Sequence, residues 1–219
     1  MSIIHRTTLT PTKMELLSAW LPTRPWYLGT AGTADPVKAG GFRLDDPRGE
    51  VGIEFMVATD QAGERPVTYH VPLTYRASPL DGAEDALVGT TEHGVLGQRW
   101  VYDGTRDPVL VHQLVALIQG SAAAQAQSQS DTPDPTVRVR AAAPASLTPA
   151  GFTASDSPNG TLLRIQVSAA AKLSVAISRV LAEDVGLEQD GGGYVTAPWR
   201  GPDDTTIRSV FATATTGPV

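Results

Sequence analysis

The chain has 219 residues, 41% of them hydrophobic and 18% charged, which is the composition of an ordinary globular protein. A formal net charge of −6 argues against nucleic acid and anionic membrane surfaces as partners, because both attract clustered lysine and arginine. Cysteine is absent, which excludes disulfides, thiolate nucleophiles and cysteine-bound metals. No segment approaches the ~20 apolar residues of a membrane span and no signal-peptide core is visible, so we expect a cytoplasmic protein.

A short strand and a helix are the first predicted elements. Residues 2–8 favour an opening strand. Thr12 and Glu15 have the spacing of a capping box, in which each side chain bonds the backbone N–H of the other. An apolar stripe follows and Pro22 ends the pattern, which predicts a one-sided helix of about three turns lying across a sheet.

Residues 24–49 contain few regular elements in this prediction. Trp26 and the next aromatic residue admit two interpretations, a surface that stacks on a sugar ring or a hydrophobic anchor beneath a loop. Residues 30–40 favour a loose segment. Residues 41–44 predict a short strand, and the turn-type sequence after it contains two solvated aspartates rather than a Mg²⁺ site.

Residues 50–59 and 66–76 are the most strand-like part of the chain. A strand's side chains switch face at every residue, so both runs place four or five apolar groups on one face. The short connector contains Asp and Gly, which predicts a hairpin. The alternating apolar residues are Val51, Ile53, Phe55 and Val57 in the first run and Val67, Tyr69, Val71, Leu73 and Tyr75 in the second.

Two strands and a second helix are predicted next. Residues 88–93 and 97–104 have strand composition. Asp107 is suited to cap a helix that starts at Pro108, and Gly120 stands just past its end. The residues between them are too apolar for a surface helix, so we expect this helix to be buried on most sides.

The second half of the chain predicts further β-structure. Residues 121–136 favour a linker or a tapering helix end, and therefore a boundary between a domain at 1–120 and a β-rich region at 137–219. Residues 172–181 fit a helix or a strand, and the turn residues around them favour the strand. Residues 194–213 predict a closing hairpin. The fold class is α+β, with an antiparallel sheet, two packed helices and a smaller β-rich region.

Candidate functional residues concentrate between positions 92 and 103. They are Glu92, His93, Arg99, Trp100, Tyr102 and Asp103, and two interpretations stay open, a binding surface or structural and turn residues. Adjacent residues of a strand point to opposite faces, so Glu92 and His93 cannot form a catalytic dyad there. His70 favours a solvated or hydrogen-bonded side chain, and His112 has no chelating partner one helical turn away.

Sequence motifs of several enzyme classes are missing. The G-x-S-x-G, H-E-x-x-H and P-loop patterns do not occur, so no catalytic residue, cofactor or metal site is predicted. An enzyme that uses Glu92 or His93 is retained only as a third hypothesis.

The first ~120 residues resemble the N-terminal cap domain of bacterial maltokinases. The resemblance rests on an ordered series of motifs: Ile3–Pro11, the helix to Trp20-Leu21-Pro22, Arg24–Tyr27, Gly41–Leu44, Val67–Tyr69, Val71–Arg76, Leu80–Ala83, Gly94–Gly97, Trp100–Gly104 and Asp107–Val109. It implies a curved antiparallel sheet with a helix packed on it. Maltokinases transfer phosphate from ATP to maltose in the route from trehalose to α-glucan.

The chain departs from maltokinases in the catalytic lobe. Such a lobe needs an H-x-D-type loop and a D-F-G-like segment, and neither occurs in the sequence, so no catalytic residue is carried over. The residues after position 136 are also too few for such a lobe, and they are only weakly similar to a kinase N-lobe.

Two functions follow as expectations. The first is a stand-alone, non-catalytic accessory or regulatory protein in maltose, trehalose or α-glucan metabolism, whose partner is a pathway enzyme or a carbohydrate. The alternative is a carbohydrate-binding module with a pocket between sheet and helices. The pocket would be lined by Trp26, Tyr69, Trp100 and Tyr102, and the full set of ligand or partner candidates adds Glu92, His93 and Arg99.

Overall fold

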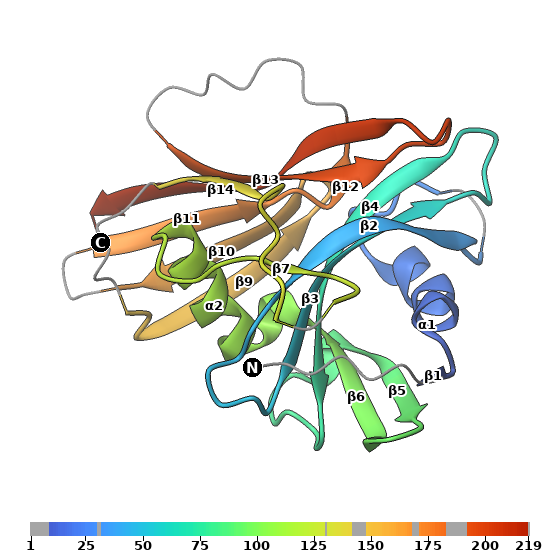
Figure 1. The fold of residues 1–219 in the computed structure, drawn as a ribbon, viewed down its shortest axis with the longest axis horizontal. Helices are drawn as coiled ribbons and strands as arrows, with labels where there is room; N and C mark the ends of the chain where they lie inside the picture. Colours follow the sequence, from blue (N-terminus) through green and yellow to red (C-terminus); the bar gives the residue numbers. More distant parts are fainter. Residues whose placement is uncertain are drawn as a thin grey trace.

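The computed structural model describes residues 9–29, 32–129, 131–141, 148–167, 171–182 and 192–218. Within these residues, one 14-stranded sheet has the order β1-β5-β6-β4-β3-β2-β13-β14-β11-β10-β9, with β7, β8 and β12 attached to it laterally. Figure 1 shows the sheet curling around helix α2, with helix α1 on the opposite side of β3 and β4. The α+β class with a curved antiparallel sheet and two helices is confirmed.

Residues 9–118 contain six strands and both α-helices of the described chain. Their bounds are β1 Leu9–Thr10, α1 Lys13–Trp20, β2 Pro36–Leu44, β3 Gly52–Asp60, β4 Val67–Arg76, β5 Leu87–His93, β6 Gly97–Asp103 and α2 Pro108–Ile118, with 3-10 turns η1 Leu21–Thr23, η2 Glu84–Ala86 and η3 Gly104–Arg106. The later strands are β7 Gln125–Ala126, β8 Arg138–Arg140, β9 Gly151–Ser157, β10 Gly160–Gln166, β11 Ala171–Ile177, β12 Val180–Leu181, β13 Gly193–Arg200 and β14 Thr206–Pro218.

The helix signals in the sequence are confirmed. The capping box of α1 is present, with Thr12 and Glu15 each bonding the other's backbone N–H. Asp107 accepts a hydrogen bond from the backbone of Val109 at the start of α2, and Gly120 has a φ of +77° just past its end. These contacts satisfy backbone groups that a helix end otherwise leaves without partners.

Most strand predictions hold, with one error in length. The hairpin β3–β4, the strands β5 and β6, the closing hairpin β13–β14 and the strand character of residues 172–181 are confirmed. Residues 30–40 were expected to be loose, yet β2 begins at Pro36 and pairs with β3 through a register shift between Lys38 and Gly40. A β-bulge of this kind disrupts the alternation that identifies a strand in sequence. The predicted strand at 2–8 lies outside the described residues.

The β3–β4 register corrects the expectation of one apolar face. Val57 pairs with His70, and Ala58 pairs with Tyr69. Directly paired residues share a face, so the apolar set of β3 faces α2 whereas that of β4 faces α1. Alternation within one strand shows that one of its faces is apolar. The strand register, which the turn between β3 and β4 sets, decides on which face of the sheet those apolar residues lie. The central hairpin is therefore apolar on both faces, and each helix covers one of them.

Two hydrophobic cores result from this arrangement. On the α2 side, Phe42 and Phe55 stack with ring centroids 4.6 Å apart, and Phe211 of β14 lies 5.9 Å from Phe42. On the α1 side, Trp20 and Trp26 pack against the outer residues of β3 and β4. Residues of α2, β10, β11, β13 and β14 complete the first core, so it contains side chains from both halves of the chain.

The sheet closes on itself near the start of β4. After β11, Ser178 donates its backbone N–H to Phe211, and the next residue accepts a hydrogen bond from the backbone of His70. β12 then pairs with β4, with Val180 opposite Tyr69. The chain thus returns from β11 to the central hairpin β3–β4.

The predicted linker at 121–136 contains a strand. β7 pairs with β2, with Ala126 opposite Phe42, so this segment lies against the sheet. The domain boundaries at 120 and 136 stay a prediction. Among the described residues, no helix combines the length and the apolar character needed to cross a bilayer.

Candidate functional site

Trp26 and Tyr69 lie in the core beneath α1. Both are fully buried, with ring centroids 5.9 Å apart, and Trp20 packs edge-on against Trp26 at 5.7 Å. The Tyr69 hydroxyl accepts a hydrogen bond from the backbone N–H of Leu28. Of the two interpretations of Trp26, the structure supports the hydrophobic anchor beneath a loop.

Trp100 and Tyr102 lie on the other face of the sheet. Tyr102 is opposite Thr74, and it packs with Trp100 against the loop that contains Ala83 and Ala86. Trp26 and Tyr69 face α1, so the four aromatic residues form two separate clusters. The predicted pocket lined by all four is therefore wrong. The sequence pattern could not reveal this, because face assignment depends on pairing between strands.

Glu92 lies on the opposite face of the β5–β6 hairpin from His93 and Arg99, because side chains alternate between faces along a strand. Glu92 is exposed and lies opposite Gln98, on the face of Trp100. His93 Nδ1 accepts hydrogen bonds from the backbone of Val95 and Leu96, at 3.3 and 3.1 Å. Arg99 donates to the backbone oxygen of Leu96 at 2.8 Å. His93 and Arg99 thus shape the β5–β6 turn.

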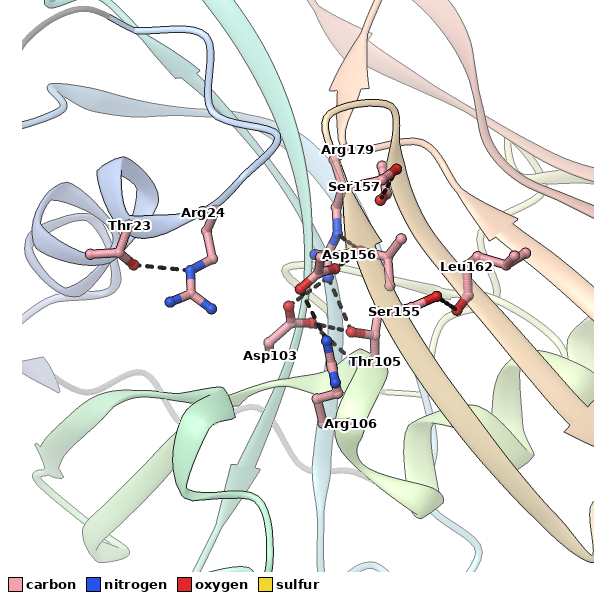
Figure 2. A network of polar contacts seen from close by, with 12 residues as sticks. Thr23, Arg24, Asp103, Thr105, Arg106, Ser155, Asp156, Ser157, Leu162 and Arg179 are labelled. Carbon is pink, nitrogen blue, oxygen red and sulfur yellow. Dashed lines mark hydrogen bonds and ion pairs between the residues drawn. The ribbon is translucent and has the colours of Figure 1, made fainter.

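A buried ion pair between Arg179 and Asp103 is the largest feature that the sequence did not reveal. Arg179 Nη2 lies 2.5 Å from Asp103 Oδ2 and 3.1 Å from Thr105 Oγ1, and its Nε donates to Thr161 at 2.7 Å. Its guanidinium also lies 4.9 Å from the ring of Trp26. Figure 2 shows Arg179 directed between the strands toward Asp103 and Thr105. Nothing in the local sequence of Arg179 predicts a partner so far along the chain.

Charge pairing overcomes burial at Asp103. Burial raises the pKa of the carboxyl, but the Arg179 guanidinium and hydrogen bonds from Arg179 and Thr105 outweigh it, so the pKa lies below its ordinary value. The carboxylate is therefore charged and fully engaged. A group held in this way stabilises the fold and has no oxygen left for a substrate.

The network continues into β9 and β10. Arg106 donates to Asp156 at 3.1 Å, and Thr161 donates to the other oxygen of Asp156 at 2.5 Å. Figure 2 shows Arg106 below Asp156, at the level where η3 meets the later strands. This chain of contacts ties the end of β6 to the region after residue 150.

Glu54 forms a second buried polar cluster, on the α1 side of β3. Its carboxylate accepts from Lys13 Nζ at 2.5 Å, the Tyr75 hydroxyl at 2.5 Å and Gln127 Nε2 at 2.8 Å. Burial raises the Glu54 pKa, but Lys13 and the hydrogen bonds lower it below its usual value. Burial and the Glu54 charge raise the pKa of Tyr75 well above its usual value, so it stays a neutral donor. The cluster ties α1 and residue 127 to the sheet.

His70 is buried rather than solvated, which corrects part of the expectation. Its Nδ1 is 2.9 Å from the Ser178 backbone oxygen, so the hydrogen-bonded part of the expectation holds. Its ring lies 5.8 Å from Phe55 and 4.4 Å from Phe211. Burial, followed by the Arg179 charge, lowers the pKa of His70 to about 3, so the imidazole is neutral in the fold.

A cavity of about 170 Å³ lies between the start of β2 and the β13–β14 turn. It contains none of the residues proposed from the sequence as ligand contacts. Its lining residues are Val37, Lys38, Ala39, Thr59, Gln61, Arg200, Gly201 and Pro202. Within the described ranges, no three His, Cys, Asp or Glu side chains are grouped as metal ligands.

A comparison with protein families matches a segment in the first half of the chain. The model of the maltokinase N-terminal cap domain matches residues 20–107. The chain contains a maltokinase N-terminal cap domain. The match runs from Trp20, the last residue of α1, to Asp107, the N-cap of α2, and it covers β2 to β6.

Only one of the two residues of the buried ion pair lies within the matched segment. Asp103 belongs to the cap domain, whereas Arg179 lies outside the matched residues. All seven residues proposed from the sequence as binding candidates lie inside the cap domain. Their binding role stays a prediction.

Proposed function

We propose that this chain is a non-catalytic, cap-like accessory protein of maltose, trehalose or α-glucan metabolism, and that it acts by contacting a pathway enzyme. The cap-domain match over residues 20–107 carries the proposal. The sequence has no H-x-D-type loop or D-F-G-like segment, so we infer a role without phosphoryl transfer.

The β5–β6 turn of the cap domain is the contact point that we propose. Val95 and Leu96 are adjacent, and 60% and 46% of their surfaces are exposed. His93 and Arg99 hold the turn through hydrogen bonds to its backbone, so this apolar tip is preorganised. Covering such a solvent-exposed apolar pair with a partner surface removes it from water, which favours binding.

Site-specific photo-crosslinking tests the contact. A photoreactive amino acid at position 95 is expected to crosslink an enzyme that acts on maltose, trehalose or α-glucan, identified by mass spectrometry. The same amino acid at position 139 is the matched control, because Val139 is also an exposed apolar residue but lies on β8, outside the cap domain. Equal crosslinking from both positions, or an unrelated product from position 95, contradicts the proposal.

A transfer assay tests the non-catalytic part separately. The purified chain is incubated with ATP, Mg²⁺ and maltose, and phosphorylated maltose is measured by mass spectrometry. We expect none above a control without protein. Product that scales with protein concentration would show that the chain is an enzyme.

A further inference from the structure

One face of the β5–β6 hairpin carries three polar side chains around a tryptophan. Thr90 lies opposite Trp100, and Glu92 lies opposite Gln98. Directly paired residues, and residues two apart along a strand, share a face, so the four side chains form two adjacent rows. Glu92 and Gln98 are exposed, and Thr90 and Trp100 are partly exposed.

The opposite face of the same hairpin is covered. Thr91 and Val101 alternate with the four residues above and are 2% and 1% exposed. Thr91 donates to the backbone of Pro11, and Val101 belongs to the core under α1. The exposed side chains therefore lie on the one face of β5 and β6 that α1 leaves accessible.

Three polar groups on the accessible face have no partners in the described part of the chain. Among the described residues, no hydrogen bond or ion pair engages the indole N–H of Trp100, the Gln98 amide or the Glu92 carboxylate. Arg76, the residue opposite Trp100 on β4, is different. Its guanidinium donates to both oxygens of Asp107, at 2.6 and 2.7 Å.

Packing holds the tryptophan in place before any ligand arrives. Trp100 contacts the cluster formed by Ala83, Ala86 and Tyr102, so one side of its ring rests on the 77–86 loop. The Tyr102 hydroxyl in turn accepts a hydrogen bond from the backbone of Leu80, which fixes that loop. A ring held by packing loses little conformational entropy when it binds.

The chemistry of this face selects the class of ligand. An indole ring offers an apolar surface and one N–H donor, and it suits the C–H face of a sugar ring. Amide and hydroxyl groups can donate to and accept from sugar hydroxyls, and a carboxylate accepts from them. The charge of Glu92 opposes an anionic ligand, and Arg76 is already engaged by Asp107.

We propose that the face formed by Thr90, Glu92, Gln98 and Trp100 binds a neutral oligosaccharide. A sugar ring stacks on Trp100, and its hydroxyls bond Gln98 and Glu92. This site goes beyond the protein contact proposed above, since the apolar tip at Val95 and Leu96 is not part of it. Each proposal can fail without the other.

Nuclear magnetic resonance of the ¹⁵N-labelled chain tests the site directly. The chain has four tryptophans, and three of them, Trp20, Trp26 and Trp199, are at most 6% exposed. Maltohexaose at millimolar concentration is expected to shift the indole N–H signal of Trp100 and leave the other three in place. A Trp100→Phe variant assigns that signal. Absence of any shift in the wild-type chain overturns the proposal without relying on a variant.

Substitutions on this face and at a distant exposed site provide the matched comparison. Gln98→Ala and Glu92→Ala are expected to weaken maltohexaose binding at least about fivefold, because each removes a hydrogen bond to the ligand. Arg200→Gln changes an exposed side chain at the end of β13, away from the hairpin, and is expected to leave the affinity unchanged. Binding that survives Trp100→Ala with wild-type affinity, or equal losses in the Gln98 and Arg200 variants, overturns the site.

Discussion

Arg179 and Asp103 are 76 residues apart in sequence, yet their side chains form an ion pair with 0% and 2% exposure. Asp103 ends β6 in the cap domain, and Arg179 lies between β11 and β12. The pair forms only when the later strands return to the cap domain. It is therefore a direct measure of whether the two parts of the chain are assembled.

Removing Arg179 is expected to destabilise the fold strongly. Arg179→Met leaves the Asp103 carboxylate buried without its cation, and breaking a buried pair in this way costs about 3–5 kcal/mol of unfolding free energy. Urea unfolding followed by circular dichroism measures the loss. The double variant Arg179→Met with Asp103→Leu is expected to be more stable than Arg179→Met alone, because no charge is left buried.

An exposed ion pair provides the control for this prediction. Arg200 and Asp204 are 2.9 Å apart, with side-chain exposures of 73% and 78%. Solvent screens such a pair, so Arg200→Met is expected to change the unfolding free energy by less than about 1 kcal/mol. Comparable losses in the Arg179 and Arg200 variants would show that burial does not decide the effect.

Acid is expected to destabilise the chain through His70. The pKa of His70 is about 3 in the fold and 6.5 in its ordinary state, so between these values the unfolded chain binds one more proton than the folded chain. The unfolding free energy should therefore fall as the pH drops from 6.5 toward 3. The full effect is on the order of 5 kcal/mol.

The variant His70→Phe isolates this contribution. Phenylalanine keeps an aromatic ring beside Phe55 and Phe211 and does not titrate. Urea unfolding across the acidic range should then show a shallower loss of stability in the variant, by about one proton at its steepest. Parallel curves for the two chains would contradict a buried neutral imidazole.

Local patterns predicted the elements, whereas pairing between strands decided how they assemble. Thr12 with Glu15, and Asp107 with Gly120, identify both helices, because capping is a contact between residues a few positions apart. The face on which Tyr69 lies depends on the β3–β4 register, which alternation alone does not specify. The sequence therefore predicts the hairpin but not the two-sided core.

The candidate site divides in the same way. Alternation already separates Glu92 from His93, and the structure places Glu92 beside Gln98 on an accessible face. The sequence gives no sign of Arg179, because an isolated arginine has no local pattern and its partner lies on a distant strand. Buried long-range pairs of this kind emerge only once the topology is known.

Gly41 is expected to be far less tolerant of substitution than Gly49. Gly41 has a φ of +126°, and a Cβ there would lie 2.2 Å from the Phe55 backbone oxygen and 3.0 Å from Gln127. Gly49 has a φ of +70° and open space around it. Gly49→Ala should cost about 1 kcal/mol from backbone strain alone, whereas Gly41→Ala should cost more than about 2 kcal/mol. Urea unfolding compares them, and equal costs would contradict the close approach of Gly41 to the Phe55 backbone.

The two halves of the chain are expected to unfold together. Phe42 and Phe55 of the cap domain pack in one core with Phe211, and β13 continues the sheet from β2. A fragment of residues 1–120 keeps α2 but exposes the side of this core that β10, β11, β13 and β14 cover. We expect the full chain to unfold in one thermal transition, and the fragment to lose its near-ultraviolet dichroism and bind a hydrophobic dye. A core shared across residue 120 cannot survive the removal of half the side chains that line it. A fragment that unfolds cooperatively at the same midpoint temperature as the full chain would therefore contradict this prediction and show an independent domain that ends near residue 120.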